Sequence, residues 1–545
     1  MLPFDNAAAA VTLSDAIARR LKQYGVQRVF GIPGTHNLEL FRALGVAGVE
    51  VISAHHEQGL GYAADAYSRV SGKPAVVVTT TGPGITNLIT ALATSLAASV
   101  PVLAIAPGIP ESGEGGSTGW LHDLPSQQHL MGQLVRSARV QSAQDAVLFI
   151  DEIAQSWQTD RPLPAYLEVP FDRFTLEGRV APRELPKVQV SSGPAQAEIE
   201  RAAQRLVAAA RPLVVVGRGG THPDAANSVR QIAEALGAPV MTTANAKGVL
   251  DEAHPLSLGV SLRVNAAKEM LEHSDAVLVV GSDLGSSEFW GPCPSFGDRL
   301  IRIDVDALMI RANAVAEVPL LGRSEAILPK LAVTVTEQLD GNLAASTGWE
   351  TADLQAVSTE LASAGEMYRR FHELVQEFTD PLEIAIAGDS SQVTYLGTAT
   401  YWKAHRPNRF LYPAGYGTLG YAIPAAIGAA LTGKVERVLA ITGEGGMLFS
   451  VQELATAAAY DLPIVTIVFA NGGYQEIREG MEAAGIAPVG VDFDTPDFVS
   501  IARGFGIEAR SVVADGADEN EFREALSWAL EQSGPTLIEV QVTDL

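Results

Sequence analysis

A glycine-rich turn follows an apolar, strand-like run near the C-terminal end of the sequence. The run covers residues 438–442, the turn is Gly443-Glu444-Gly445-Gly446, and a helical pattern follows to Tyr460. A turn of this kind brings backbone N–H groups close to a diphosphate at the start of the helix. Glu444 adds a carboxylate to that position.

A second oxygen ligand, Asn471, stands at the end of the next strand-like run, residues 464–469. Because adjacent parallel strands end at the same edge of a sheet, we expect Glu444 and Asn471 to lie close together. Carboxylate, amide and phosphate oxygens are the ligands of a hard cation such as Mg²⁺. The pair therefore predicts a site for a metal and a diphosphate, whereas either turn alone would be an ordinary strand-to-helix connection.

Three further segments carry residue types that could do chemistry. Glu57 begins a helix directly after a strand-like run. An acid there suits the helix dipole, and a buried carboxylate can also share a proton. The loop 79–87 reads TTTGPGITN, and its glycines permit a close approach of the backbone. Residues 414–424 read AGYGTLGYAIP and are equally rich in glycine.

Together these segments resemble the thiamine diphosphate enzymes of the acetolactate synthase and 2-oxo acid decarboxylase group, over essentially the whole chain. The resemblance rests on the family's GDG and NN motifs, its TSGPGATN loop, its GLGTMGFGLP segment and its GxPG turn, here residues 31–34. It implies that Glu444, Asn471 and the carbonyl of Gly473 bind Mg²⁺ or another divalent cation. Glu444 replaces the usual Asp and Ala470 the usual first Asn, which leaves the metal preference open.

The resemblance also implies the roles of the other site residues. Glu57 would bind the aminopyrimidine ring of thiamine diphosphate, and Leu419 would wedge under the cofactor and bend it. The catalytic residues would be Glu57, His122, Thr80, Gln127 and Glu476. The cofactor would be bound by Gly34, Thr35, Asn87, Gly417, Thr418, Leu419, Gly443, Gly445, Gly446, Met447 and Tyr474.

The activity implied is decarboxylation of a 2-oxo acid through ylid addition and an enamine, giving an aldehyde. Some segments look like decarboxylases of 2-oxo acids derived from arginine, and Asp123 or Glu288 would be conceivable partners for a cationic tail. The first alternative is an acetolactate-synthase-like carboligase that joins two carbonyl substrates. The second is a non-catalytic protein of the same fold that binds a nucleotide or a partner chain, which the substitutions at 444 and 470 suggest.

Apolar strand-like runs alternate with helical patterns almost throughout, which predicts an α/β fold with parallel sheets covered on both faces. Breaks in the pattern divide it into three doubly wound domains in series. We expect a pyrimidine-binding domain at 1–180, a central domain at 190–335 and a diphosphate- and metal-binding domain at 360–545. The central turn 216–220 (VGRGG) lacks an acidic partner for a ribose, so FAD is not expected.

The composition narrows the function classes further. The 545 residues carry a formal net charge of −25, which disfavours nucleic acids and anionic membranes. The one cysteine rules out an internal disulfide and a cysteine-based zinc site. No signal peptide or membrane-spanning run is evident, so we expect a cytoplasmic enzyme acting on small molecules. The resemblance implies a homo-oligomer, at least a dimer, with a tetramer expected.

Overall fold

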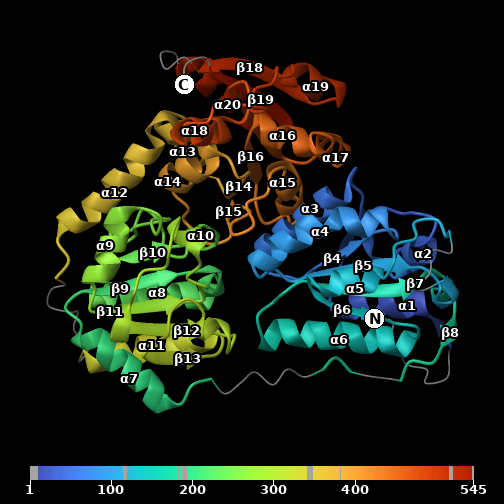
Figure 1. Cartoon of the computed structure of the whole chain (residues 1–545), viewed down its shortest axis with the longest axis horizontal. Coiled ribbons are helices and arrows are strands. Elements are labelled where there is room, and N and C mark those ends of the chain that lie inside the picture. The colour runs from blue at the N-terminus through green and yellow to red at the C-terminus, as the bar shows by residue number, and fades with distance from the viewer. Residues whose placement is uncertain are drawn as a thin grey trace. The chain divides into compact units, whose positions relative to one another are not determined.

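The computed structural model contains three parallel-sheet α/β domains in series, as predicted (Figure 1). It describes residues 10–113, 119–181, 184–186, 193–339, 348–380, 382–514 and 519–542. The predicted linkers near 180–190 and 335–360 fall partly outside these ranges. The chain forms two compact units: residues 1–189, 423–434 and 450–462 make the first, and the remaining residues make the second. Within the described ranges, no helix is long and apolar enough to cross a membrane.

The first unit is built on a six-stranded parallel sheet with the order β3-β2-β4-β5-β7-β6. Its strands are β2 (Arg28–Gly31), β3 (Glu50–Ile52), β4 (Ala75–Val78), β5 (Val102–Gly108), β6 (Arg136–Arg139) and β7 (Ala165–Pro170), and β1 (Val11–Thr12) pairs with β8 (Glu177–Gly178). Its helices are α1 (Leu13–Gln23), α2 (Leu38–Val46), α3 (Glu57–Ser71), α4 (Pro83–Ala97), α5 (Gln127–Gly132), α6 (Ala143–Thr159), α15 (Ala422–Ala430) and α17 (Glu453–Ala459). In Figure 1, α3 and α4 lie on one side of this sheet and α6 on the other.

The second unit holds the other two sheets. The central sheet has the order β10-β9-β11-β12-β13, and its strands are β9 (Pro212–Val216), β10 (Val240–Thr242), β11 (Ala276–Val280), β12 (Leu300–Asp304) and β13 (Val318–Leu321). The third sheet has the order β15-β14-β16-β17-β19-β18, and its strands are β14 (Ile384–Gly388), β15 (Phe410–Leu411), β16 (Arg437–Gly443), β17 (Ile464–Ala470), β18 (Glu508–Ala514) and β19 (Thr536–Val542).

Five helices of the second unit cover the two faces of the central sheet. Apolar residues of α7, α8 and α11 pack on one face, and those of α9 and α12 pack on the other. The helices are α7 (Gln196–Ala208), α8 (Pro223–Leu236), α9 (Asn265–His273), α10 (Ser286–Phe289), α11 (Ser324–Gln338), α12 (Thr351–Gly365), α13 (Arg369–Thr379), α14 (Ala399–Tyr401), α16 (Glu444–Ser450), α18 (Gln475–Ala483), α19 (Phe498–Gly504) and α20 (Glu519–Glu531).

Local sequence explains many of these elements, and the structure differs from the predictions in two respects. Thr12 caps α1 by accepting a hydrogen bond from the backbone N–H of Asp15. The helix predicted from the glycine turn to Tyr460 is broken into α16 and α17. Among the strands that the apolar runs did not predict, β6 and β18 lie at sheet edges, and β6 (RSAR) has a single apolar residue.

Helices α15 and α17 pack tightly on α3 within the first unit, although their sequences lie in the third domain. A Cβ atom on Gly428 of α15 would collide with the carbonyl of Ala63, so only glycine fits there. On the other side, a Cβ on Gly59 would lie 2.6 Å from the carboxylate of Glu453 in α17. The start of α3 is therefore fixed by segments far away in the chain.

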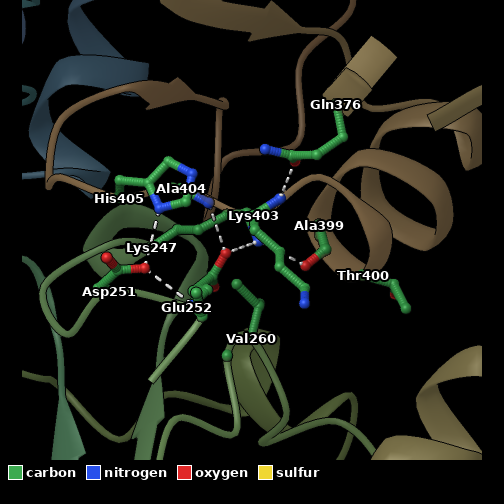
Figure 2. Close-up of polar contacts among 12 residues, drawn as sticks. Lys247, Asp251, Glu252, Val260, Gln376, Ala399, Thr400, Lys403, Ala404 and His405 are labelled. Carbon is green, nitrogen blue, oxygen red and sulfur yellow. Dashed lines mark hydrogen bonds and ion pairs between the residues drawn. The ribbon is translucent and has the colours of Figure 1, made fainter. Parts of the chain in front are cut away.

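A buried ion pair within the second unit connects the segment after β10 to α14 and the residues that follow it (Figure 2). Lys247 Nζ lies 2.5 Å from Glu252 Oε2 and donates a hydrogen bond to the carbonyl of Ala399. Glu252 also accepts from the backbone N–H of Ala404 at 2.9 Å. Both side chains of the pair are almost completely buried, so each charge depends on its partner.

Replacing Lys247 by Met should lower the free energy of unfolding by about 3–5 kcal/mol, because the carboxylate of Glu252 then stays buried without a cation. The double variant Lys247→Met, Glu252→Gln should recover part of this loss. Urea unfolding followed by circular dichroism measures both. The exposed Lys403 provides the control, since Lys403→Met should change stability little. Equal unfolding midpoints for Lys247→Met and the wild type would contradict the prediction.

Candidate functional site

In the first unit, the predicted residues lie on loops that leave neighbouring parallel strands at their carboxyl ends. Residues 32–37 follow β2, residues 53–56 follow β3, and residues 79–82 follow β4. After β2 the chain continues to β3 on one side, and after β4 it continues to β5 on the other, so the connections diverge between the neighbouring strands β2 and β4. Such a switch point is where open α/β sheets bind ligands.

Glu57 is the first residue of α3, and its carboxylate is held in place from the neighbouring helix. Asn87 of α4 donates a hydrogen bond from Nδ2 to Glu57 Oε2 at 3.0 Å. The side chain of His56 caps α3 by accepting from the backbone N–H of Gln58. A Cβ on Gly84 would lie 3.4 Å from Glu57 Oε1, so the loop after β4 passes close to this carboxylate.

A buried carboxylate on α17 fixes the chain just before Glu57. Glu453 is fully buried and accepts hydrogen bonds from the backbone N–H groups of His55 and His56. Thr456 donates to the same carboxylate at 2.7 Å and also contacts the ring of His55. Burial raises the pKa of Glu453, and these hydrogen bonds offset part of the rise. No sequence pattern signals this role, because the contact joins residues about 400 positions apart.

Thr80 and Gly34 meet between the loops that follow β2 and β4. A Cβ on Gly34 would lie 2.8 Å from Thr80 Oγ1, so glycine is needed for the approach. The hydroxyl of Thr80 is buried and has no hydrogen-bond partner among the described residues. A buried hydroxyl without a hydrogen-bond partner costs free energy, and a bound ligand would remove that cost by supplying the partner. The neighbouring Thr35 is exposed.

Gln127 lies beneath the loop after β4 and is 5% exposed. Its Oε1 accepts from the backbone N–H of Gly82 at 2.8 Å, and its Nε2 donates to the carbonyl of Pro107 and to the side chains of Tyr166 and Glu168. Both ends of this amide are occupied by the protein. The structure therefore shows Gln127 supporting the loop after β4.

His122 also borders this loop, and its backbone has a φ of +64°, which is unusual for a residue with a side chain. Its ring nitrogen Nδ1 is buried and has no partner among the described residues. Its carbonyl oxygen would lie 2.5 Å from a Cβ on Gly82. The ring of His36, a residue that the sequence did not single out, lies beside it.

In the second unit, the turn after β16 and the turn after β17 lie side by side, because these strands are paired in parallel with Gly443 opposite Phe469. Glu444 is 1% exposed, and its Oε2 accepts from the backbone N–H of Asn471 at 2.8 Å and from Thr495 Oγ1 at 3.1 Å. Burial raises the pKa of Glu444, and these bonds offset part of the rise. Its Oε1 is buried without a partner among the described residues.

The glycines of these turns are required by close contacts. A Cβ on Gly445 would collide with the ring of Tyr474, and one on Gly446 would lie 2.6 Å from Asp389 Oδ2. Gly473 has a φ of +153°, and a Cβ there would collide with the carbonyl of Val491. Met447 is completely buried, so it can serve a ligand through its backbone N–H and not through its side chain.

Asp389, at the end of β14, links the glycine turn to the segment that holds Leu419. Its Oδ1 accepts from the backbone N–H of Tyr421 at 2.6 Å, and its Oδ2 accepts from Thr442 Oγ1 at 2.6 Å. Burial raises the pKa of Asp389 to about 6. Leu419 is half-buried, and Gly417 and Gly420 bend the chain on either side of it with φ of +68° and +80°. Thr418 lies beside them and is half-buried.

Glu476, in the first turn of α18, is held by two side chains that follow β14. Gln392 Nε2 donates to Glu476 at 2.8 Å and to Glu479 at 2.7 Å, and Tyr395 donates to Glu476 at 2.5 Å. Burial and the neighbouring Glu476 raise the pKa of Tyr395. The aromatic ring of Trp290 packs edge-on against Tyr395. The side-chain amide of Gln392 thus holds the carboxylates of Glu476 and Glu479 close to each other.

The structure brings the predicted residues together within each unit. In the first unit these are Gly34, Glu57, Thr80, Asn87 and His122, and in the second they are Gly443, Glu444, Gly445, Gly446, Asn471, Gly473 and Tyr474. Among the described residues, no group of three His, Cys, Asp or Glu side chains is placed to hold a metal. A cation bound at Glu444 would therefore need oxygens from amides, carbonyls and the ligand itself.

Comparison with known proteins identifies relatives along the whole chain. Residues 11–130 match the thiamine pyrophosphate enzyme, N-terminal TPP binding domain; residues 199–331 match the central domain; residues 389–540 match the C-terminal TPP binding domain. The chain is 33% identical over 539 residues to the probable 2-ketoarginine decarboxylase of Pseudomonas aeruginosa, covering 97% of this chain and 94% of the relative.

Two further relatives are acetolactate synthase large subunits. The probable acetolactate synthase large subunit of Methanocaldococcus jannaschii is 27% identical over 554 residues, covering 97% of this chain and 91% of the relative. The acetolactate synthase isozyme 1 large subunit of Escherichia coli is 29% identical over 566 residues, covering 97% and 94%. The similarity therefore extends over all three domains.

Replacing Glu453 by Gln should flatten the pH dependence of the stability. The pKa of Glu453 is raised in the folded protein, so the native state holds this proton to higher pH than the unfolded chain. Stability is consequently lost as the pH rises from the ordinary value of 4.5 through the raised value, and a neutral amide removes that loss. Urea unfolding at a series of mildly acidic to neutral pH values measures the slope.

The exposed Glu177 supplies the matched control for this experiment, because Glu177→Gln removes a carboxylate from the same unit without touching a buried group. Its slope should equal that of the wild type. The same slope in Glu453→Gln and Glu177→Gln would contradict the prediction.

Proposed function

We propose that this chain, which belongs to the family of thiamine pyrophosphate enzymes, catalyses the decarboxylation of a 2-oxo acid. The proposal rests on the position of the Glu57 carboxylate. Glu57 begins α3, and Asn87 donates a hydrogen bond that orients its carboxylate. The chain before Glu57 is fixed by Glu453, and burying that second carboxylate costs free energy, as its raised pKa indicates. That cost is explained by a need for one fixed proton-sharing group.

The residues present fit thiamine diphosphate and a divalent cation. Glu444 Oε1 is buried and unpartnered among the described residues, which suits a metal ligand. Gly445 and Gly446 leave a turn without side chains, and their backbone N–H groups suit a diphosphate. We infer that Glu444, Asn471 and the carbonyl of Gly473 hold the cation, Mg²⁺ being the first choice to test.

Each remaining group then has a task. Glu57 would bind the pyrimidine ring of the cofactor by sharing a proton, and Asn87 orients its carboxylate. Leu419 would contact the bound cofactor, on a segment that Asp389 anchors through the backbone N–H of Tyr421. Bound thiamine diphosphate supplies the nucleophile and the electron sink for the loss of carbon dioxide. Because the family resemblance implies a cofactor shared by two chains, we infer a homo-oligomer, at least a dimer.

The substrate class we propose is a 2-oxo acid with a cationic tail. The chain is similar to a probable 2-ketoarginine decarboxylase, and Glu476 and Glu479 form an acidic pair on α18. A guanidinium pairs well with two carboxylates. The sequence suggested Asp123 or Glu288 for this role. Burial raises the pKa of Glu288 to about 7, which makes it a weaker anion near neutral pH.

Carboligation is the second candidate function. Acetolactate synthase large subunits align with 97% of the chain, and the same catalytic residues would serve both reactions. The two activities differ in the fate of the carbon that has lost carbon dioxide. It takes up a proton in a decarboxylase and bonds to a second carbonyl in a carboligase.

Release of carbon dioxide from a panel of 2-oxo acids tests the proposal. The panel contains pyruvate, branched and aromatic acids, 2-oxo-arginine and a neutral acid of the same length, with thiamine diphosphate and Mg²⁺ added or withheld. We expect cofactor-dependent release, fastest with 2-oxo-arginine, and an aldehyde as product. A joined product with two substrate carbon skeletons would favour carboligation. No release from any acid would contradict both functions.

Replacing Glu57 by Gln should lower turnover by at least about 100-fold, because the amide cannot exchange the proton that the carboxylate carries. Binding of thiamine diphosphate, measured by calorimetry, should persist. Asn87→Ala is the companion variant and should lower turnover less, since it loosens Glu57 without removing it. Full activity of Glu57→Gln would remove Glu57 from the mechanism.

A further inference from the structure

The third sheet carries a cavity that the proposed function does not use. Helix α19 lies beside strands β18 and β19 (Figure 1), and residues of all three line a cavity of about 660 Å³. This volume is in the range of small-molecule sites. Ser511 of β18 lies opposite Glu539 of β19, and both line the cavity. Gln541, two residues after Glu539, lies opposite Ala470 of β17, and these two line it as well.

Ala470 helps to keep this cavity open. It is the last residue of β17, is 8% exposed, and stands where the family's motif has its first Asn. The side chain of Ala470 is a single methyl group, whereas an Asn at this position would extend an amide toward the cavity. The departure from the family's motif, which the proposed function leaves without a role, therefore leaves space for a ligand.

A nearly buried carboxylate, Glu539, lies in the wall of the cavity. It is 4% exposed, and it accepts a hydrogen bond from Gln541 Nε2 at 3.4 Å, which is long for a hydrogen bond. Among the described residues, no basic side chain forms an ion pair with Glu539. Burying a carboxylate without a cation costs free energy, and a cationic ligand in the cavity would remove that cost.

Two further charged residues line the cavity. Asp497 caps α19, because its carboxylate accepts from the backbone N–H of Ser500 at 2.8 Å and from Ser500 Oγ at 2.5 Å. These hydrogen bonds lower the pKa of Asp497, and the charge of Arg503 lowers it further. Arg503 is exposed and donates to the carbonyl of Ala509 at 3.3 Å. It forms no ion pair with a described carboxylate, so its guanidinium is available to an anionic group.

The charges of the lining define the ligand that would match it. Asp497 and Glu539 are acidic and Arg503 is basic, so the described lining has an excess of one negative charge. A complementary ligand carries an excess of one positive charge and still offers a carboxylate to Arg503. An amino acid with a cationic side chain has this combination, with two cationic groups and one carboxylate.

We propose that this cavity binds a basic amino acid. The carboxylate of the ligand pairs with Arg503, and the cationic side chain pairs with Glu539. The hydroxyl of Ser511 and the amide of Gln541 supply neutral hydrogen-bonding groups between these charges. Arg503 and Ser511 are exposed, so a ligand can enter from solvent.

Two residues connect the cavity to the proposed cation site. Thr495 lines the cavity and donates from Oγ1 to Glu444 Oε2 at 3.1 Å. Ala470 precedes Asn471, whose backbone N–H donates to the same oxygen at 2.8 Å. We therefore expect the amino acid and a divalent cation to change each other's affinity, by the same factor in both directions. This coupling rests on the proposed function, whereas binding of the amino acid does not.

Calorimetry on the full chain tests the site with L-arginine as the probe. L-Citrulline, whose side chain is neutral, and agmatine, which lacks the carboxylate, are the comparison probes. We expect L-arginine to bind and the other two to bind at least about 10-fold more weakly, because each loses one charged hydrogen bond. A wild type that does not bind L-arginine, or that binds all three probes equally, would overturn the site.

Variants locate the bound L-arginine. Glu539→Gln and Arg503→Met should each weaken binding by at least about 10-fold, and Ala470→Asn should weaken it by occupying the cavity. Arg503 is exposed, so Arg503→Met keeps the test valid if Glu539→Gln does not fold. Glu508→Gln removes an exposed carboxylate of β18 and is the matched control, which should bind as the wild type does.

Unchanged binding in Arg503→Met and Ala470→Asn would overturn the assignment to this cavity. Binding that is lost in Glu476→Gln and kept in Glu539→Gln would assign L-arginine to the acidic pair on α18 and would equally overturn it. L-Arginine binding at the cavity by a protein that releases no carbon dioxide from any 2-oxo acid would contradict the proposed function while supporting this site.

The coupling has its own readout, which is the affinity for Mn²⁺ in the presence of thiamine diphosphate. Electron paramagnetic resonance of free Mn²⁺ measures this affinity with and without L-arginine. We expect a change of about 5-fold or more in the wild type, and none in Ala470→Asn. An unchanged affinity for Mn²⁺ in the wild type would overturn the coupling.

Discussion

Hydrogen bonds from backbone N–H groups to buried carboxylates hold both parts of the candidate site in shape. Glu453 fixes the chain before α3, Glu444 fixes the turn at Asn471, and Asp389 fixes the segment at Tyr421. Burial raises the pKa of all three acids, which shows that removing each from water costs free energy. The loops gain a defined geometry in return, because a carboxylate can accept several N–H donors at once.

The parts of the site that the sequence predicted share one physical property: their chemistry lies within a single turn. The glycine turn at Glu444 and the helix start at Glu57 each follow a strand, and parallel strands end at a common edge. The alternation of strands and helices is therefore enough to assign each residue to the ligand-binding edge of its own sheet. The central strands and the α/β class follow from the same pattern of apolar runs.

The remainder depends on contacts that sequence spacing does not encode. The pairing of His36 with His122 and the burial of Glu453 arise only when distant segments pack. A motif also does not say whether a side chain or the backbone serves a ligand. Met447 is completely buried, and the amide of Gln127 makes hydrogen bonds with four protein groups, neither of which can be read from the segment that holds the residue.

The packing of α15 and α17 on α3 has a consequence for how such a chain can diversify by recombination. The contact between Gly428 and Ala63, and that between Gly59 and Glu453, join residues on opposite sides of the central domain in the sequence. A crossover between two relatives at a domain limit would combine one parent's α3 with the other's α15 and α17. Glycines without room for a Cβ must then match, so the first and third domains must be inherited together.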